Sequence, residues 1–294
     1  MVNELLAEFT AENVLLADTQ TKSVVLLGTI KDQQAIVTVE KTAFPADATP
    51  QLADLVSSPQ LINHNDIYYW SLGLLAANPA GAKINLIYPA TEKHLRKYAA
   101  QRLHMVRETP QMYSSKVAPF IETQKGDQLQ WVRNILFESK EADSIVHDDR
   151  DPHHGFVLLP DMKWDGRTMD ALYLCVIVRR TDIASLRDLR GTHVGYLEEM
   201  QRKISAATCS TYRLEPDQLR IFVHYQPSYY HFHIHVVNVA HPGLGGGINA
   251  GKAVLLDDII SNLRLGPDYY ERQTLTYQLG EMHPLWEILN GEAL

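Results

Sequence analysis

Tyr229-Tyr-His-Phe-His-Ile-His-Val-Val-Asn-Val239 places His231, His233 and His235 two residues apart in a run that is otherwise aromatic, β-branched or apolar. This composition and alternation predict a β-strand, in which residues i, i+2 and i+4 point to the same face. Three imidazoles therefore share one face, while the residues between them pack into a core. No other stretch of the chain is as specific, and it indicates an enzyme.

Three interpretations of this strand compete. A purely structural face with three histidines is unusual. A metal site is the second interpretation, because imidazole is a common zinc ligand. Successive side chains on one strand face stand about 6.6 Å apart, which suits two of them on a metal better than three. The chain also contains no HExxH or CxxC motif. The third interpretation is a nucleophilic histidine that acts on a polyphosphate, with its neighbours assisting.

The flanking sequence favours the nucleophile. Residues 219–225 predict a partner strand that ends near His224, and residues 226–228 predict a turn that brings in the hydroxyl of Ser228. After the histidine strand comes His241-Pro-Gly-Leu-Gly-Gly-Gly-Ile-Asn-Ala-Gly-Lys252. Its glycines give backbone N–H groups close access to an anion, and Lys252 adds a positive charge. We expect a phosphate-binding turn here.

The histidine run resembles the histidine-triad motif of nucleotide hydrolases and transferases, and a larger set of blocks is similar to the scavenger mRNA-decapping enzymes. These blocks are His224-Tyr-Gln-Pro-Ser-Tyr-Tyr-His-Phe-His-Ile-His235, Asn65-Asp-Ile-Tyr68, Tyr88-Pro-Ala-Thr-Glu-Lys-His94, Arg107-Glu-Thr109 and Leu159-Pro-Asp-Met-Lys-Trp164. They follow the family order over nearly the whole chain. The resemblance implies a domain-swapped homodimer with a C-terminal histidine-triad domain, built on an antiparallel sheet with helices.

Length and composition fit this picture. The chain has 294 residues, enough for two domains, and is 45% hydrophobic and 21% charged. A net charge of -8 argues against a protein that coats long RNA or DNA. Two cysteines, no signal peptide and no long apolar run predict a cytoplasmic protein, with the nucleus as a second compartment, and no membrane attachment.

The order of elements predicts an α+β fold. We expect an N-terminal dimerisation or lid domain over residues 1–93, a hinge over 94–110 and a catalytic domain over 111–294. The predicted strands cover residues 23–29, 34–40, 82–88, 129–131, 155–160, 172–178, 219–225, 229–239 and 274–278. The predicted helices cover residues 91–101, 113–122, 194–207 and 252–263.

The resemblance also assigns residues that recognise a 7-methylguanosine cap. Trp131 matches the tryptophan that stacks on the methylated base, and Glu141 matches the acid that reads guanine. Asp161, Met162 and Lys163 match a second wall, where Met162 stands in place of the usual leucine. Further matches are Asn65, Tyr68, Tyr173, Ser228 and Lys252. Lys252 replaces an arginine of some relatives and loses its bidentate geometry.

These matches imply scavenger decapping. His233 attacks the phosphorus next to 7-methylguanosine, a covalent intermediate forms, and water releases 7-methyl-GMP. His224, His231 and His235 stabilise the phosphate charge, and we expect at least one of them to be protonated near neutral pH. No metal or other cofactor is expected. The expected substrates are the cap dinucleotide and short capped fragments.

Two alternatives remain open. The first is a hydrolase of dinucleoside polyphosphates such as Ap3A, which would use the same His233 but leave Trp131 and Glu141 without a role. The second is a weakly active cap-binding regulator that pairs with an active paralogue.

Overall fold

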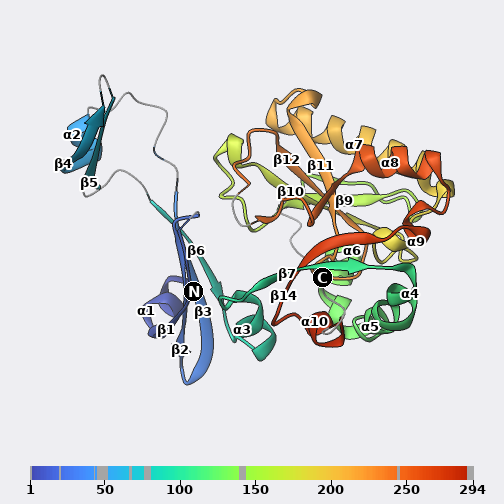
Figure 1. The fold of residues 1–294 in the computed structure, drawn as a ribbon, viewed down its shortest axis with the longest axis horizontal. Helices are drawn as coiled ribbons and strands as arrows, with labels where there is room; N and C mark the ends of the chain where they lie inside the picture. Colours follow the sequence, from blue (N-terminus) through green and yellow to red (C-terminus); the bar gives the residue numbers. More distant parts are fainter. Residues whose placement is uncertain are drawn as a thin grey trace. The chain divides into compact units, whose positions relative to one another are not determined.

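The computed structural model describes residues 2–19, 21–42, 44, 52–65, 68–75, 81–138, 144–243 and 246–289. The chain divides into an N-terminal unit, Met1–Ala100, and a C-terminal unit, Gln101–Leu294. This boundary falls inside the segment 94–110. Both units combine helices with antiparallel sheets, so the fold is α+β (Figure 1). None of the helices in the described ranges is long and apolar enough to cross a membrane.

The N-terminal unit contains a four-stranded antiparallel sheet in the order β1-β2-β3-β6. Lys31 and Asp32 connect β2 to β3 with φ angles of 48° and 63°, the conformation of a tight two-residue hairpin. A separate two-stranded hairpin, β4-β5, exposes several apolar side chains. The elements are α1 (Val2–Ala7), β1 (Thr10–Asp18), β2 (Ser23–Ile30), β3 (Gln33–Lys41), α2 (Leu52–Leu55), β4 (Val56–Asn65), β5 (Tyr68–Leu75), β6 (Ala82–Ile87) and α3 (Glu92–Tyr98).

The C-terminal unit is built on a six-stranded antiparallel sheet in the order β13-β11-β12-β10-β9-β8. A two-stranded ribbon, β7-β14, lies in the same unit. Its strands are β7 (Leu103–Glu108), β8 (His147–Asp148), β9 (Phe156–Pro160), β10 (Tyr173–Val178), β11 (Leu219–His224), β12 (His233–Asn238), β13 (Ala253–Leu255) and β14 (Leu275–Gly280). Its helices are α4 (Pro110–Met112), α5 (Ala118–Thr123), α6 (Gln130–Glu138), α7 (Val194–Tyr212), α8 (Leu256–Leu265), α9 (Tyr269–Arg272) and α10 (Pro284–Leu289), with a π-helical turn at Tyr113–Val117 between α4 and α5.

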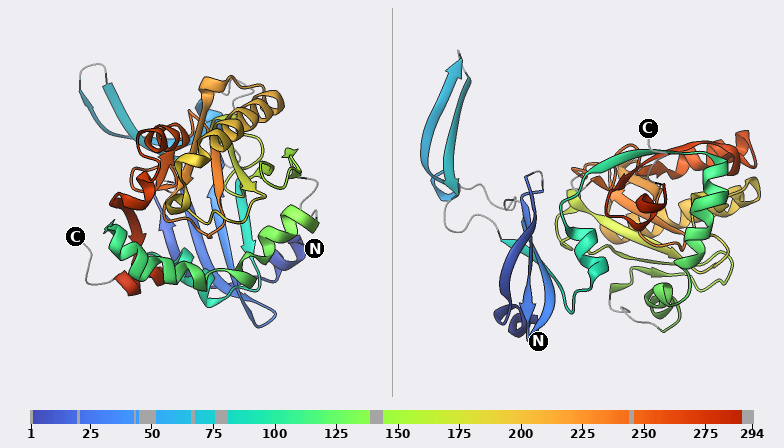
Figure 2. Two further views of the ribbon diagram at one scale, coloured as in Figure 1. Left: turned by 90° about the vertical axis from the view of Figure 1, so that its right-hand side faces the viewer. Right: turned by 60° about the horizontal axis from the view of Figure 1, so that its bottom comes forward.

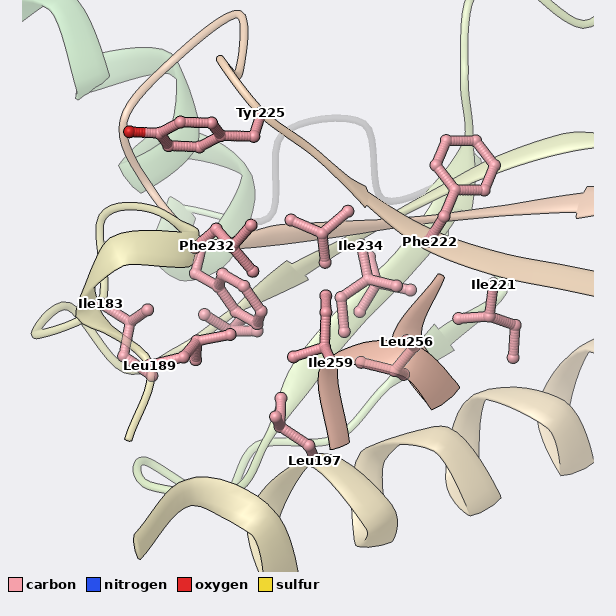
Figure 3. Packing of buried hydrophobic residues seen from close by; sticks show 14 of the residues in the cluster. Ile183, Leu189, Leu197, Ile221, Phe222, Tyr225, Phe232, Ile234, Leu256 and Ile259 are labelled. Carbon is pink, nitrogen blue, oxygen red and sulfur yellow. The ribbon is translucent and has the colours of Figure 1, made fainter. Parts of the chain in front are cut away.

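The two faces of the C-terminal sheet bury different sets of side chains. Ile234 and Val236 of β12 belong to the main core, together with apolar residues of α7 and α8, and these two helices lie side by side (Figure 2). Ile221 and Phe222 of β11 point to opposite faces (Figure 3). The opposite face carries Cys175 and Ile177, which pack with α6 in a smaller core. Because side chains alternate along a strand, this second face also receives His233 and His235.

Three local predictions are wrong. Residues 129–131 are not a strand: α6 begins at Gln130 and buries Val132, Ile135 and Leu136, whose spacing of three and four residues is helical. The predicted helix over residues 252–263 starts too early: residues 253–255 form β13, and α8 begins only at Leu256.

The third correction concerns the histidine strand. β12 begins at His233 rather than at Tyr229, so a loop of eight residues follows β11 in place of a three-residue turn. The backbone of Phe232 donates to Ile183 O at 3.0 Å instead of joining the ladder with β11.

The segment around residues 102–110 contains regular structure. β7 pairs with β14 over six residues, from Leu103↔Gly280 to Glu108↔Leu275. The sequence analysis assigned no strand there, because the partner strand lies far along the chain. The role of this segment as a hinge stays a prediction.

Candidate active site

Three imidazoles meet on the α6 side of the sheet. His224 comes from the end of β11, and His233 and His235 come from β12, where His235 lies opposite Phe222 of β11 and Cys175 of β10. The ring centroids of His224 and His235 are 4.1 Å apart, and those of His233 and His235 are 5.1 Å apart. All three side chains are buried. The predicted clustering of His224 with the histidine strand is therefore present in the structure.

The hydrogen bonding of His233 fixes its tautomer. Its Nδ1 lies 2.8 Å from the backbone carbonyl of His231, so Nδ1 carries the proton and donates it. The lone pair then resides on Nε2. Within the described part of the chain, Nε2 of His233 has no hydrogen-bond partner, although it is buried. An unprotonated, unpartnered nitrogen on a neutral ring is suited to nucleophilic attack.

His231 differs from the other two members of the histidine run. It precedes β12, and its side-chain Nε2 donates to Val178 O at 2.7 Å, at the end of β10. Its backbone carbonyl is the acceptor for His233. The structure therefore gives His231 an orienting contact with His233, while the predicted contact of its side chain with phosphate stays a prediction.

Burial keeps these imidazoles neutral in the substrate-free protein. It lowers the pKa of His233 to about 4, against the opposing effect of the bond to His231. Burial, with the charge of Lys252 second, lowers the pKa of His224 to about 3. The pKa values of His231 and His235 are also lowered, again mainly by burial. The expectation that one neighbour is protonated near neutral pH is therefore wrong for the free site.

Several polar side chains gather around Gly247, next to His224. Lys163 Nζ donates to the hydroxyl of Tyr173 at 3.1 Å, and His224 Nε2 donates to the carbonyl of Gly247 at 2.6 Å. A Cβ placed on Gly247 would lie 3.5 Å from Tyr173 Oη, 3.8 Å from Lys163 Nζ and 3.9 Å from His224 Nε2. Gly247 therefore lies among N–H and O–H groups of the kind that bind phosphate.

A hydrogen-bonded turn holds the backbone at Lys163. Asp161 Oδ1 accepts the backbone N–H of Lys163 at 2.9 Å, and this turn follows β9 directly. The turn leaves the Met162 side chain 67% exposed. Asp161 therefore shapes the turn, and Met162 is accessible to a ligand as its predicted role requires.

A chain of aromatic contacts connects the surface to His233. Trp131 on α6 is 43% exposed, and its ring meets Tyr229 edge-on at 4.7 Å between centroids. The ring of Tyr229 stacks on His233 at 4.0 Å and 14°. The Tyr229 hydroxyl lies 3.6 Å from Cys175 Sγ. The sequence analysis did not select Tyr229, and only its position next to Ser228 in the quoted block could have suggested it.

The remaining predicted residues are placed as follows. Lys252 Nζ donates to Gln226 O at 2.5 Å, and Ser228 is exposed in the loop before β12. Glu141 lies outside the described residues. Asn65 and Tyr68 form a register pair of β4 and β5 in the N-terminal unit, and their side chains are likewise outside the described set. The roles predicted for these five residues stay predictions.

The arrangement supports one kind of chemistry well. A neutral imidazole presents a lone pair near the cationic side chains of Lys163 and Lys252, as needed for nucleophilic substitution at a phosphate with electrostatic stabilisation of the developing charge. Among the described side chains, no group of three or more His, Cys, Asp or Glu could hold a metal ion. The site therefore defines the class of histidine-dependent enzymes acting on phosphate esters or anhydrides.

Comparison with known proteins narrows this class. A model described as "Scavenger mRNA decapping enzyme (DcpS) N-terminal" matches residues 4–101, and one described as "Scavenger mRNA decapping enzyme C-term binding" matches residues 130–251. The chain belongs to the scavenger mRNA-decapping enzyme family, as the sequence analysis expected.

Curated relatives extend over nearly the whole chain. The m7GpppX diphosphatase of Schizosaccharomyces pombe is 43% identical over 293 residues, covering 98% of this chain and 96% of the relative. The one from Ascaris suum is 39% identical over 280 residues, covering 95% and 92%. The one from Homo sapiens is 38% identical over 290 residues, covering 96% and 85%.

Proposed function

We propose that this protein is a scavenger decapping hydrolase, which cleaves the triphosphate bridge of 7-methylguanosine cap dinucleotide and of short capped RNA fragments. The observation that carries the proposal is the tautomer of His233, whose protonated Nδ1 leaves Nε2 as a lone pair. The curated relatives, all named m7GpppX diphosphatase, support the choice of substrate.

In the first step, Nε2 of His233 forms a bond to the phosphorus next to 7-methylguanosine. The bond from that phosphorus to the bridging oxygen breaks, and a nucleoside diphosphate or a diphosphorylated fragment leaves with the electron pair. The His231 carbonyl accepts the Nδ1–H throughout, and so stabilises the positive charge that the ring acquires. In the second step, water forms a bond to the same phosphorus and loses a proton to solvent, while the P–N bond breaks and its electron pair returns to Nε2. This releases 7-methyl-GMP and restores the neutral ring.

Binding of the substrate favours protonation of the neighbouring imidazoles. Nearby negative charge favours the charged form of an imidazole. A bound triphosphate therefore raises the pKa values of His224 and His235, which burial and neighbouring positive charges hold low in the free site. Lys163 adds a cationic side chain beside Gly247 and His224. The bound complex thereby gains the positively charged imidazoles that the free site lacks.

Base recognition follows from the exposed aromatic and apolar side chains. Trp131 stacks on the methylated base, whose positive charge adds a cation–π contribution, and Met162 packs on the opposite ring face. Both side chains are accessible for these contacts, with exposures of 43% and 67%. This assignment favours methylated cap over Ap3A. The adenine of Ap3A carries no positive charge for Trp131 to stabilise, and it lacks the guanine N–H groups that an acidic side chain would bind.

The protein is further proposed to be a homodimer with exchanged N-terminal elements. The β4-β5 hairpin exposes Leu61, Ile62, Leu72, Leu74 and Leu75 by between 45% and 69%. An isolated two-stranded hairpin is marginally stable in water. A second copy of the chain would cover these apolar side chains. We place the protein in the cytoplasm, with the nucleus as a second compartment.

The decisive experiment incubates purified protein with 7-methyl-GpppG in EDTA and resolves the products by chromatography. Release of 7-methyl-GMP and GDP is the expected result, and His233→Asn should abolish it while cap binding persists. His153→Asn, on an exposed turn, is the matched control. Turnover by His233→Asn would refute the nucleophile. Faster cleavage of Ap3A would favour the first alternative, and tight cap binding without turnover would favour the regulator.

The oligomeric state has a separate test. Light scattering coupled to gel filtration should report a dimer for the wild type and a monomer for the double variant Leu72→Lys with Leu74→Lys. Leu265→Lys, which changes an 84% exposed residue of the C-terminal unit, should stay dimeric. A monomeric wild type would refute the dimer.

A further inference from the structure

A buried carboxylate that the mechanism does not use lies in the C-terminal unit. Glu108, the last residue of β7, has a fully buried side chain. Its Oε1 accepts from Arg187 Nε at 2.8 Å and from the Tyr225 hydroxyl at 2.7 Å. Its Oε2 accepts from Gln226 Nε2 at 3.0 Å and from the Tyr277 hydroxyl at 2.8 Å. Both oxygens are therefore doubly hydrogen-bonded.

Stability alone is a weak reason for this arrangement. Arg187 is as buried as Glu108, and its guanidinium also donates to the carbonyls of Tyr270 and Gln273 at 2.6 and 2.7 Å. Removing two charges from water is expensive, and replacing such pairs by apolar residues is often neutral or stabilising. The contacts of the Glu108–Arg187 pair with neighbouring segments therefore suggest a role beyond stability.

The Glu108 carboxylate holds the loop that precedes β12. Tyr225 and Gln226 are the first two residues of this loop, and both donate to Glu108. The other amide atom of Gln226, Oε1, accepts from the hydroxyl of Tyr230 at 3.1 Å. Gln226 therefore connects the start of the loop to its far end. Tyr230 directly precedes His231, whose carbonyl accepts the Nδ1–H of His233.

We propose that Glu108 and Arg187 are positioning residues for His233, acting through Gln226, Tyr230 and the His231 carbonyl. The chain of hydrogen bonds places that carbonyl where it selects the Nδ1-protonated tautomer. When the chain is broken, the carbonyl shifts, the alternative tautomer with a protonated Nε2 becomes populated, and that fraction has no lone pair to attack with. The consequence for catalysis rests on the proposed decapping function, whereas the effect on the tautomer does not.

Gln226→Met and Tyr277→Phe form a matched pair of variants. Gln226→Met removes the connection between Glu108 and Tyr230 but leaves the carboxylate its bonds to Arg187, Tyr225 and Tyr277. Tyr277→Phe removes a donor to the same carboxylate from β14 and the contact of that hydroxyl with the Gln226 side chain, but leaves the bonds of Gln226 to Glu108 and Tyr230 in place. A role confined to stability predicts similar behaviour for both. A positioning role predicts that only Gln226→Met affects His233.

The kinetic test measures kcat and KM for 7-methyl-GpppG together with the thermal midpoint of each variant. Gln226→Met should lower kcat by about 10-fold or more, since small misplacements of reacting groups are costly. Its KM should stay within about 3-fold, because the cap contacts are unchanged. Tyr277→Phe should keep its kcat even where its thermal midpoint falls. Glu108→Gln should resemble Gln226→Met if it folds.

The spectroscopic test reads the His233 tautomer from ¹⁵N chemical shifts of labelled protein. The wild type should show a protonated Nδ1 and an unprotonated Nε2, and Gln226→Met should show a mixture. Retention of both kcat and the wild-type tautomer in Gln226→Met would overturn the proposal. Equal losses of kcat in both variants, in proportion to stability, would also overturn it. If the wild type fails to cleave cap, the proposed function falls, but a mixed tautomer in Gln226→Met would still support the positioning role.

Discussion

Acidification should destabilise this protein through its buried imidazoles, and His233 allows the effect to be measured. Burial lowers its pKa from 6.5 to about 4 in the folded protein, whereas the unfolded chain has the ordinary value. Between these two values the unfolded state binds more protons than the folded state. The free energy of unfolding therefore falls as the pH drops from 6.5 towards 4, and is unaffected by this group at higher pH.

The magnitude follows from the size of the pKa shift. Each unit of difference corresponds to about 1.4 kcal/mol, so His233 should cost about 2 kcal/mol at about pH 5 and about 3 kcal/mol once the pH is well below 4. His224, with its pKa lowered to about 3, acts in the same direction. Because neighbouring imidazoles titrate together, the contributions are not additive.

The assay compares urea unfolding of the wild type and His233→Asn at about pH 8 and about pH 5, at one protein concentration. Asparagine does not titrate, so the loss of stability between the two pH values should be smaller in the variant by about 2 kcal/mol. His153→Asn, which changes an exposed imidazole, should behave like the wild type. An equal pH dependence in the wild type and His233→Asn would refute the neutral, buried state assigned to this histidine.

Three further predictions concern the site and its support. Trp131→Ala should raise KM for methylated cap by about 10-fold or more in steady-state kinetics with little change in kcat, because a stacking contact is lost; an unchanged KM would remove Trp131 from base recognition. Gly247→Ala should lower kcat/KM by placing a methyl group against Lys163, Tyr173 and His224, with a small change in the thermal midpoint, since a Cβ there meets its neighbours at 3.5 Å or more. Arg187→Met should cost about 3–5 kcal/mol in urea unfolding because it leaves Glu108 buried without its counter-charge; similar stability to the wild type would contradict the ion pair.

The sequence by itself determined the family and the shared face of two histidines. Alternation of histidines with apolar residues requires only the geometry of a strand, so the shared face of His233 and His235 could be predicted locally. The apolar run at residues 172–178 likewise predicted a strand, and β10 lies there, between β12 and β9 in the sheet. The order of the quoted blocks was sufficient to identify the family.

The tertiary structure decided how those residues work. The tautomer of His233 depends on where the His231 carbonyl lies, and that carbonyl belongs to a loop held by Glu108, which is 117 residues away from Tyr225 in sequence. The low pKa values of His224 and His233 depend on burial by elements distant in the chain. The helical state of Trp131 depends on how α6 packs its apolar residues on the sheet. Sequence patterns report local periodicity, whereas desolvation and hydrogen bonding between remote segments arise only when the chain has folded.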